Sequence, residues 1–97
     1  MMTLNSIKKI IKEHKAEIQE KYFVEKIGVF GSYVKGEQKP ESDIDILVEF
    51  YKPVDFFEYL ELEELLCNAL GNRIDLVSIK ALKPRIGKYI LEEVQFL

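Results

Sequence analysis

An alternating run at residues 43–50 constrains the fold more than any other part of the chain. Successive side chains of a β-strand point to opposite faces, so this run predicts one wholly apolar face, formed by Ile44, Ile46, Val48 and Phe50. The other face begins with two carboxylates, Asp43 and Asp45, which an extended strand places about 7 Å apart. Like charges on one face destabilise a fold unless a cation lies between them. The run therefore predicts a strand that is core on one side and a candidate metal site on the other.

A second apolar run, residues 24–30, precedes the acidic strand and ends at Gly31 and Ser32. The glycine inside this run, Gly28, indicates close approach of another backbone segment. After Ser32 the pattern predicts a short helix or tight turn, and the polar residues 36–42 predict a loop. A glycine–serine turn that opens a helix offers backbone N–H groups and a hydroxyl to phosphate oxygens. Gly31 and Ser32 are therefore candidate nucleotide-binding residues.

A helix at residues 56–70 is predicted to connect the acidic strand to a third strand at residues 73–77. A strand, a helix of this length and another strand are typical of a right-handed crossover, in which the two strands are parallel neighbours. This topology brings Asp75, from the third strand, next to Asp43 and Asp45.

Two further helices complete the expected order of elements, αβαβαβα. Residues 5–21 form an amphipathic helix with Asn5 as its N-cap, and residues 84–93 form the last helix. The side chains expected on buried helix faces include Phe56 in the helix at 56–70 and Ile86, Tyr89, Ile90 and Val94 in the last helix. Residues 95–97 are compatible with a terminal strand. The sequence thus predicts one α/β (α+β) domain over residues 1–97.

The bulk composition excludes several classes of protein. A net charge of −3 provides no basic surface for a nucleic-acid backbone, so direct nucleic-acid binding is not expected. No apolar run approaches the roughly 20 residues that span a bilayer, and the N-terminus lacks the apolar core of a signal peptide. A cytoplasmic protein is expected. The single histidine, His14, and the single cysteine, Cys67, leave little material for His- or Cys-based sites.

The aspartates carry the chemical signal. The chain has thirteen glutamates but only four aspartates, and three of the four lie on predicted strands, where aspartate is normally rare. Carboxylate oxygens are the protein ligands that Mg²⁺ prefers, with water and phosphate completing the coordination. Two-metal catalysis needs carboxylates that hold both ions roughly 3.5–4 Å apart. Asp43, Asp45 and Asp75, together with Gly31 and Ser32, therefore indicate a site for a nucleoside triphosphate and two Mg²⁺ ions.

The order of these residues resembles a known signature. Gly-Ser at 31–32, ten residues and Asp-Ile-Asp at 43–45 are similar to the signature of the DNA polymerase β-like nucleotidyltransferases. The fuller string at 31–50, the Arg-Ile-Asp-Leu-Val at 73–77 and the Lys-Pro-Arg-Ile-Gly-Lys-Tyr-Ile at 83–90 resemble the minimal nucleotidyltransferases. The resemblance covers nearly the whole chain.

This resemblance implies a mixed sheet in the order 1-2-3 with helices packed beside it. It implies that Asp43 and Asp45 bind Mg²⁺, and that Asp75 helps to bind one ion and to deprotonate the attacking hydroxyl. Gly31 and Ser32 would hold the β- and γ-phosphates of ATP. Attack on the α-phosphorus would then release pyrophosphate and leave AMP on the acceptor.

The acceptor is expected to come from a separate molecule or a second subunit, because the chain ends soon after the expected catalytic core, and a protein partner fits best. In minimal nucleotidyltransferases paired with a HEPN-domain toxin, the acceptor is a tyrosine of the toxin and the transferase is the antitoxin. The resemblance implies this protein adenylyltransferase role. Two alternatives stay open: an antitoxin that acts only by binding the toxin, and a transferase that modifies a small molecule. Where family members commonly carry Ala-Arg-Gly, this chain has Val34, Lys35 and Gly36. Lys35 keeps the positive charge of the arginine but lacks its bidentate fork.

Overall fold

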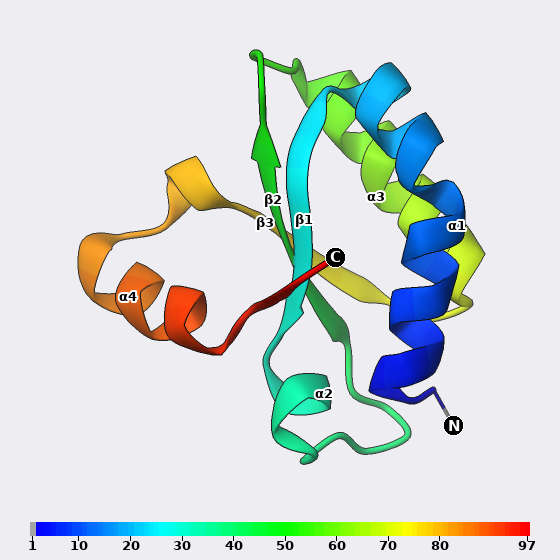
Figure 1. Ribbon diagram of the computed structural model, residues 1–97, viewed down its shortest axis with the longest axis vertical. Helices are drawn as coiled ribbons and strands as arrows, with labels where there is room; N and C mark the ends of the chain where they lie inside the picture. Colours follow the sequence, from blue (N-terminus) through cyan, green and yellow to red (C-terminus); the bar gives the residue numbers. More distant parts are fainter. Residues whose placement is uncertain (1) are drawn as a thin grey trace.

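Four strands form one mixed sheet in the computed structural model, which describes residues 2–97. The strands are β1 (Val24–Phe30), β2 (Ile44–Phe50), β3 (Ile74–Ser78) and β4 (Gln95–Phe96). The helices are α1 (Leu4–Tyr22), α2 (Ser32–Lys35), α3 (Phe56–Leu70), the 3₁₀ turn η1 (Ile79–Ala81) and α4 (Pro84–Glu93). Figure 1 shows α1 and α3 on one side of the sheet and α4 on the other. No helix within residues 2–97 is long and apolar enough to cross a membrane.

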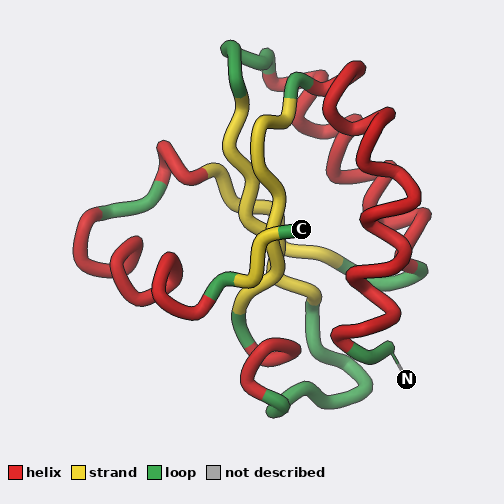
Figure 2. The backbone as a smooth tube through the Cα atoms, in the orientation of Figure 1, coloured by secondary structure: helices red, strands yellow, loops and turns green. Residues whose placement is uncertain are grey.

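The strand order is β3-β2-β1-β4. Figure 2 shows the strands at the centre of the molecule, with helices on either side. β2 pairs parallel with β3 and antiparallel with β1, so the expected order 1-2-3 is confirmed for the first three strands. β4 pairs antiparallel with the free edge of β1 and adds a strand to the expected order αβαβαβα. Gly28 makes this pairing possible, because a Cβ there would lie 2.8 Å from Val94 Cγ2 and 2.9 Å from the Gln95 carbonyl oxygen.

The hydrophobic core lies between the sheet and the pair of helices α1 and α3. Ile44, Ile46 and Val48 are fully buried, as the alternation in β2 predicts. The side chains that meet them are Ile7, Ile11 and Ile18 of α1, Ile27 and Val29 of β1, and Leu62 and Leu66 of α3. Complete burial of such a side chain stabilises a fold by about 1.5–3 kcal/mol. This core fixes β2 and, with it, the acidic face on the opposite side of the strand.

The N-terminal cap of α1 differs from the expectation. The helix begins at Leu4, and Thr3 is its N-cap instead of Asn5. Thr3 accepts a hydrogen bond from the Ser6 backbone N–H, while the Ser6 side chain accepts one from the Thr3 N–H. This reciprocal pair satisfies two backbone donors at once, which a cap at Asn5 would leave unpaired.

Three side chains expected on buried helix faces are exposed. Phe56, Ile86 and Tyr89 have exposed fractions of 69%, 57% and 65%. Phe56 is the first residue of α3, before the helix reaches the core. In α4 only Gly87 is buried, because α4 lies on the open side of the sheet and no other described element covers its outer face. The apolar stripe that the sequence predicts in α4 is present, but Ile86 and Tyr89 on it face solvent.

Candidate active site

The parallel pairing of β2 and β3 places two carboxylates on adjacent strands. Asp45 lies directly opposite Asp75 in the register, and Ile44 lies opposite Ile74. Neighbouring strands are about 4.8 Å apart, so the two aspartates are as close as separate strands allow. The expected adjacency of Asp75 to the acidic strand is therefore confirmed at the level of the backbone.

Asp43 lies one residue before β2, although the sequence predicts that it opens the strand. The ladder starts at Ile44, whose N–H donates to the Arg73 carbonyl at 3.0 Å. The Asp43 Oδ1 atom lies 3.2 Å from Arg73 Nε, and the side chains of Arg73 and Asp43 are 81% and 46% exposed. Within residues 2–97, no group of three His, Cys, Asp or Glu side chains is already arranged as a metal site. In this arrangement the Asp43 carboxylate is paired with Arg73.

Gly31 lies against Asp45 at the end of β1. Its backbone has φ +78° and ψ −149°, a combination that is essentially restricted to glycine. A Cβ at position 31 would overlap the Asp45 carboxylate, whose Cγ would be 2.9 Å away. The Gly31 N–H donates to Glu93 Oε1 at 3.0 Å. Gly31 thus serves the approach of the protein's own carboxylate, and its N–H is already occupied.

Ser32 opens α2 and presents the donors that remain. The N–H groups of Val34 and Lys35 both donate to the Gly31 carbonyl at 3.1 Å. The preceding N–H groups, those of Ser32 and Tyr33, have no partner within the helix, as at any helix start. These two N–H groups and the half-buried Ser32 hydroxyl are positioned at the turn for an anionic ligand such as a phosphate.

The electrostatics of the site centre on Asp45. Burial, followed by the nearby charges of Asp75, Asp43 and Glu93, raises the pKa of the Asp45 carboxyl from 3.8 to about 6. A bound cation would relieve this repulsion, and hard carboxylate oxygens are the ligands that Mg²⁺ prefers. Asp43, Asp45 and Asp75 therefore have the chemistry of a magnesium site.

Glu93 is a residue of this site that the sequence pattern missed. From the last position of α4 it accepts the Gly31 N–H, and its Oε2 lies 3.3 Å from Lys35 Nζ. Glu93 is one of thirteen glutamates and occupies a helix, where glutamate is an ordinary surface residue. It is also 62 positions from Gly31, so no local spacing could single it out.

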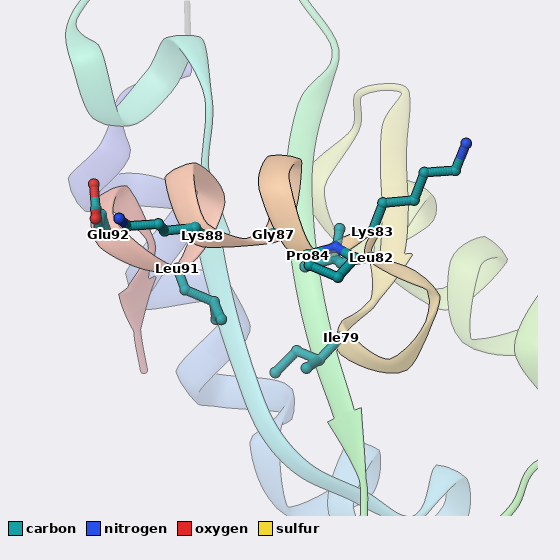
Figure 3. Close-up of a pocket in the computed structure, with 8 residues that line it drawn as sticks. All are labelled: Ile79, Leu82, Lys83, Pro84, Gly87, Lys88, Leu91 and Glu92. Atoms are coloured by element: carbon teal, nitrogen blue, oxygen red, sulfur yellow. The ribbon is translucent and has the colours of Figure 1, made fainter.

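A sizeable cavity lies away from the carboxylates. It has a volume of about 490 Å³ between η1 and α4 and is lined mainly by apolar groups, among them Ile79, Leu82 and Leu91. Figure 3 shows Ile79 and Leu91 directed toward the space under α4, while the Lys83 ammonium points away from it. None of the residues predicted for the site lines this cavity.

Comparisons with known proteins agree with this geometry. Residues 7–97 match the nucleotidyltransferase domain family. The protein adenylyltransferase MntA of Thermococcus cleftensis is 47% identical over 97 residues, which cover all of this chain and 98% of that protein. A solved structure described as a minimal nucleotidyltransferase is similar with a TM-score of 0.84 and 30% identity, over 99% of this chain and 97% of the other. A complex of the tri-AMPylated Shewanella oneidensis HEPN toxin with its MNT antitoxin matches at TM-score 0.67 and 26% identity, over 98% of this chain and 71% of that one.

Together with the mixed sheet, these matches show that the chain is an enzyme of nucleotidyl transfer. The chain belongs to the nucleotidyltransferase domain family, within the minimal nucleotidyltransferases that include the protein adenylyltransferases.

Proposed function

We propose that this protein uses Mg²⁺ and ATP to transfer AMP to a tyrosine of a HEPN-domain toxin, and so acts as the antitoxin of that toxin. The observation that carries the proposal is the Asp45–Asp75 pair beside the Gly31–Ser32 turn. The relative from Thermococcus cleftensis is a protein adenylyltransferase, and the Shewanella oneidensis complex contains an AMPylated HEPN toxin. The first supports transfer of AMP to a protein, and the second supports a HEPN toxin as the protein that accepts it.

Each residue of the site has a role in this proposal. Asp45, Asp75 and Asp43 would hold two Mg²⁺ ions, which supply Lewis-acid stabilisation of the triphosphate charge when bound. The Ser32 hydroxyl and the free N–H groups at the start of α2 bind phosphate oxygens. Gly31 leaves the space in which Asp45 stands. The tyrosine oxygen forms a bond to the α-phosphorus, the bond from that phosphorus to the bridging oxygen breaks, and pyrophosphate leaves.

Asp75 is the proposed acceptor of the tyrosine proton. Its side chain is exposed, whereas Asp45 is half-buried, so Asp75 is the member of the pair that an acceptor from solution can reach. A carboxylate within hydrogen-bond reach of a hydroxyl can take its proton as the new phosphorus–oxygen bond forms. The half-buried Asp45 remains to hold charge beside the phosphates.

The open surroundings of the site favour a macromolecular acceptor. Asp43 and Asp75 are exposed, and the cavities of about 490 and 260 Å³ are lined by residues outside the site. Small-molecule substrates are usually enclosed by the pocket that binds them. A protein acceptor can instead present a hydroxyl on its own surface to an open site.

The test is incubation with α-labelled ATP, Mg²⁺ and the HEPN toxin. Label should appear on the toxin with the wild type and with Asp55→Asn, a matched control at the cap of α3, where asparagine caps as well as aspartate. The double variant Asp43→Asn, Asp45→Asn should transfer no label. Equal labelling by the double variant would exclude the proposed site.

Two further assays separate the alternatives. If the double variant still protects cells that express the toxin, the antitoxin acts by binding and transfer is not required. If a small hydroxyl compound is labelled in the absence of toxin, the acceptor is a small molecule.

A further inference from the structure

A single carboxylate from α4 holds both ends of the proposed phosphate-binding turn. Glu93 Oε1 accepts the Gly31 N–H at 3.0 Å, and Glu93 Oε2 lies 3.3 Å from Lys35 Nζ. Gly31 precedes α2 and Lys35 is its last residue, so the two contacts bracket the whole helix. The Glu93 side chain is only 25% exposed, which places the contacts in a partly desolvated setting.

We propose that Glu93 is a positioning residue for the nucleotide, which fixes the orientation of the turn from Gly31 to Lys35 so that the N–H groups of Ser32 and Tyr33 face the phosphates. The inference rests on the proposed function, because it takes the Gly31–Ser32 turn to be the phosphate site.

The backbone of Gly31 explains why the turn needs an external support. A glycine can leave its φ of +78° and ψ of −149° for many other conformations at little cost, so the residue itself does not hold the turn. A hydrogen bond from its N–H to a carboxylate is charge-assisted and restricts that freedom. The next two N–H groups, those of Ser32 and Tyr33, follow directly in the same turn, so their direction depends on the contact at Gly31.

The charge of Glu93 is compatible with a triphosphate nearby because Lys35 neutralises it. The ion pair leaves the contact with little net charge, whereas an unpaired carboxylate would repel the nucleotide. The pair also explains the lysine at position 35. A single contact with the Glu93 carboxylate needs only one cationic group, and the lysine ammonium supplies it without the bidentate fork of arginine. If Glu93 instead occupied the place of a phosphate, its removal would strengthen nucleotide binding, whereas removal of a positioning residue weakens it.

The packing of α4 allows a local loosening of the turn to be distinguished from unfolding of the whole protein. Only Gly87 of this helix is buried, and the cavity of about 490 Å³ lies between α4 and η1 (Figure 3). Segments with few buried contacts open without global unfolding. Loss of the Glu93 contacts should therefore loosen the turn and the end of α4 while the core formed by α1 and α3 stays intact.

The first experiment measures binding of Mg²⁺ with a non-hydrolysable ATP analogue by titration calorimetry. Glu93→Gln keeps an acceptor for the Gly31 N–H but loses the charge, and Glu93→Ala loses both. We expect the Kd to rise about threefold and about tenfold, respectively. Glu92→Gln, an exposed neighbour on the same helix, removes the same charge and should leave the Kd unchanged. Tighter binding by either Glu93 variant would overturn the proposal.

The second experiment follows amide hydrogen exchange at Gly31 in the nucleotide-free protein by NMR. Exchange should quicken in Glu93→Ala and less in Glu93→Gln, at an unchanged unfolding midpoint. If Glu93→Ala does not fold, Lys35→Met tests the same contact from its other end. Failure of the wild type to bind the analogue would refute the proposed function, and unchanged exchange at Gly31 would refute the role of Glu93.

Discussion

Gly31 and Asp45 are so close that any side chain at position 31 would overlap the Asp45 carboxylate. The contact joins the end of β1 to the second residue of β2, where the two strands pair. The glycine of the signature is therefore required by the protein itself, before any nucleotide binds. It sets how near the turn can come to the acidic strand.

Gly31→Ala is expected to impair both stability and transfer. The substituted residue meets a glycine-only backbone conformation and the Asp45 carboxylate, at a cost of about 2–3 kcal/mol. Gly36→Ala is the matched control, because Gly36 has φ +73° but nothing within 4 Å of its Cβ position. Its cost should be about 1 kcal/mol, with activity retained. Urea unfolding measures both, and equal losses would show that the overlap with Asp45 does not matter.

Asp45→Asn should stabilise the metal-free protein in a pH-dependent way. The pKa of Asp45 is raised from 3.8 to about 6, so the folded state prefers the protonated carboxyl. This contribution is present below pH 3.8 and is lost as the pH rises through 6. Because the side chain is half-exposed, solvent screening reduces the gain of the variant at pH 8 to the order of 1 kcal/mol.

Thermal unfolding in EDTA at pH 5 and pH 8 tests this expectation. The difference in stability between Asp45→Asn and the wild type should be largest at pH 8 and about half as large at pH 5, which lies midway between the two pKa values. Assayed separately with Mg²⁺, the variant should transfer no AMP at either pH. A variant that is less stable than the wild type at pH 8 would contradict the origin assigned to the pKa shift.

Arg73→Gln is expected to strengthen Mg²⁺ binding. Arg73 holds Asp43 through an exposed ion pair, which contributes no more than about 1 kcal/mol to stability. Its removal frees the carboxylate and takes a positive charge from the site, so the Kd for Mg²⁺ should fall about threefold. Arg85→Gln, on α4, removes the same charge from a different element and serves as the control. Weaker or equal Mg²⁺ binding by Arg73→Gln in a calorimetric titration would contradict this expectation.

Tyr59→Phe should destabilise the contact between α3 and β3. The Tyr59 hydroxyl donates to the Leu76 carbonyl in a half-buried position, and the substitution leaves that oxygen unpaired at a cost of about 1 kcal/mol. Tyr51→Phe is the matched control, because its hydroxyl donates to the Gln19 carbonyl at 3.0 Å on an exposed side chain. Chemical denaturation should show a loss below about 0.5 kcal/mol for Tyr51→Phe. Similar losses would mean that burial does not set the cost.

The sequence predicts those parts of this protein that depend on local periodicity and on connection length. Alternation in β2 identified its buried face, and the length of the segment that contains α3 predicted the parallel pairing that brings Asp45 opposite Asp75. Both follow from rules that act over a few residues or one crossover.

Other parts of the structure depend on which residues from elsewhere in the chain pack against a helix or strand, and the local sequence pattern does not contain this information. The apolar stripe of α4 was identified, but a stripe does not reveal whether anything covers it, and Ile86 and Tyr89 are exposed. The start of β2 at Ile44 was set by a bond to the Arg73 carbonyl, which the pattern of β2 itself does not contain. Glu93 could be found only from its contacts in three dimensions.

The contact between Gly31 and Glu93 spans 62 positions of the chain, which has a consequence for the order of events during synthesis. The turn and all three aspartates leave the ribosome before Glu93 does. Contacts of such large sequence separation also form late in folding, because a long loop must close first. A nascent chain can thus possess its acidic strands while the turn is still untethered. Competence to hold a nucleotide would then arrive abruptly, with the last helix.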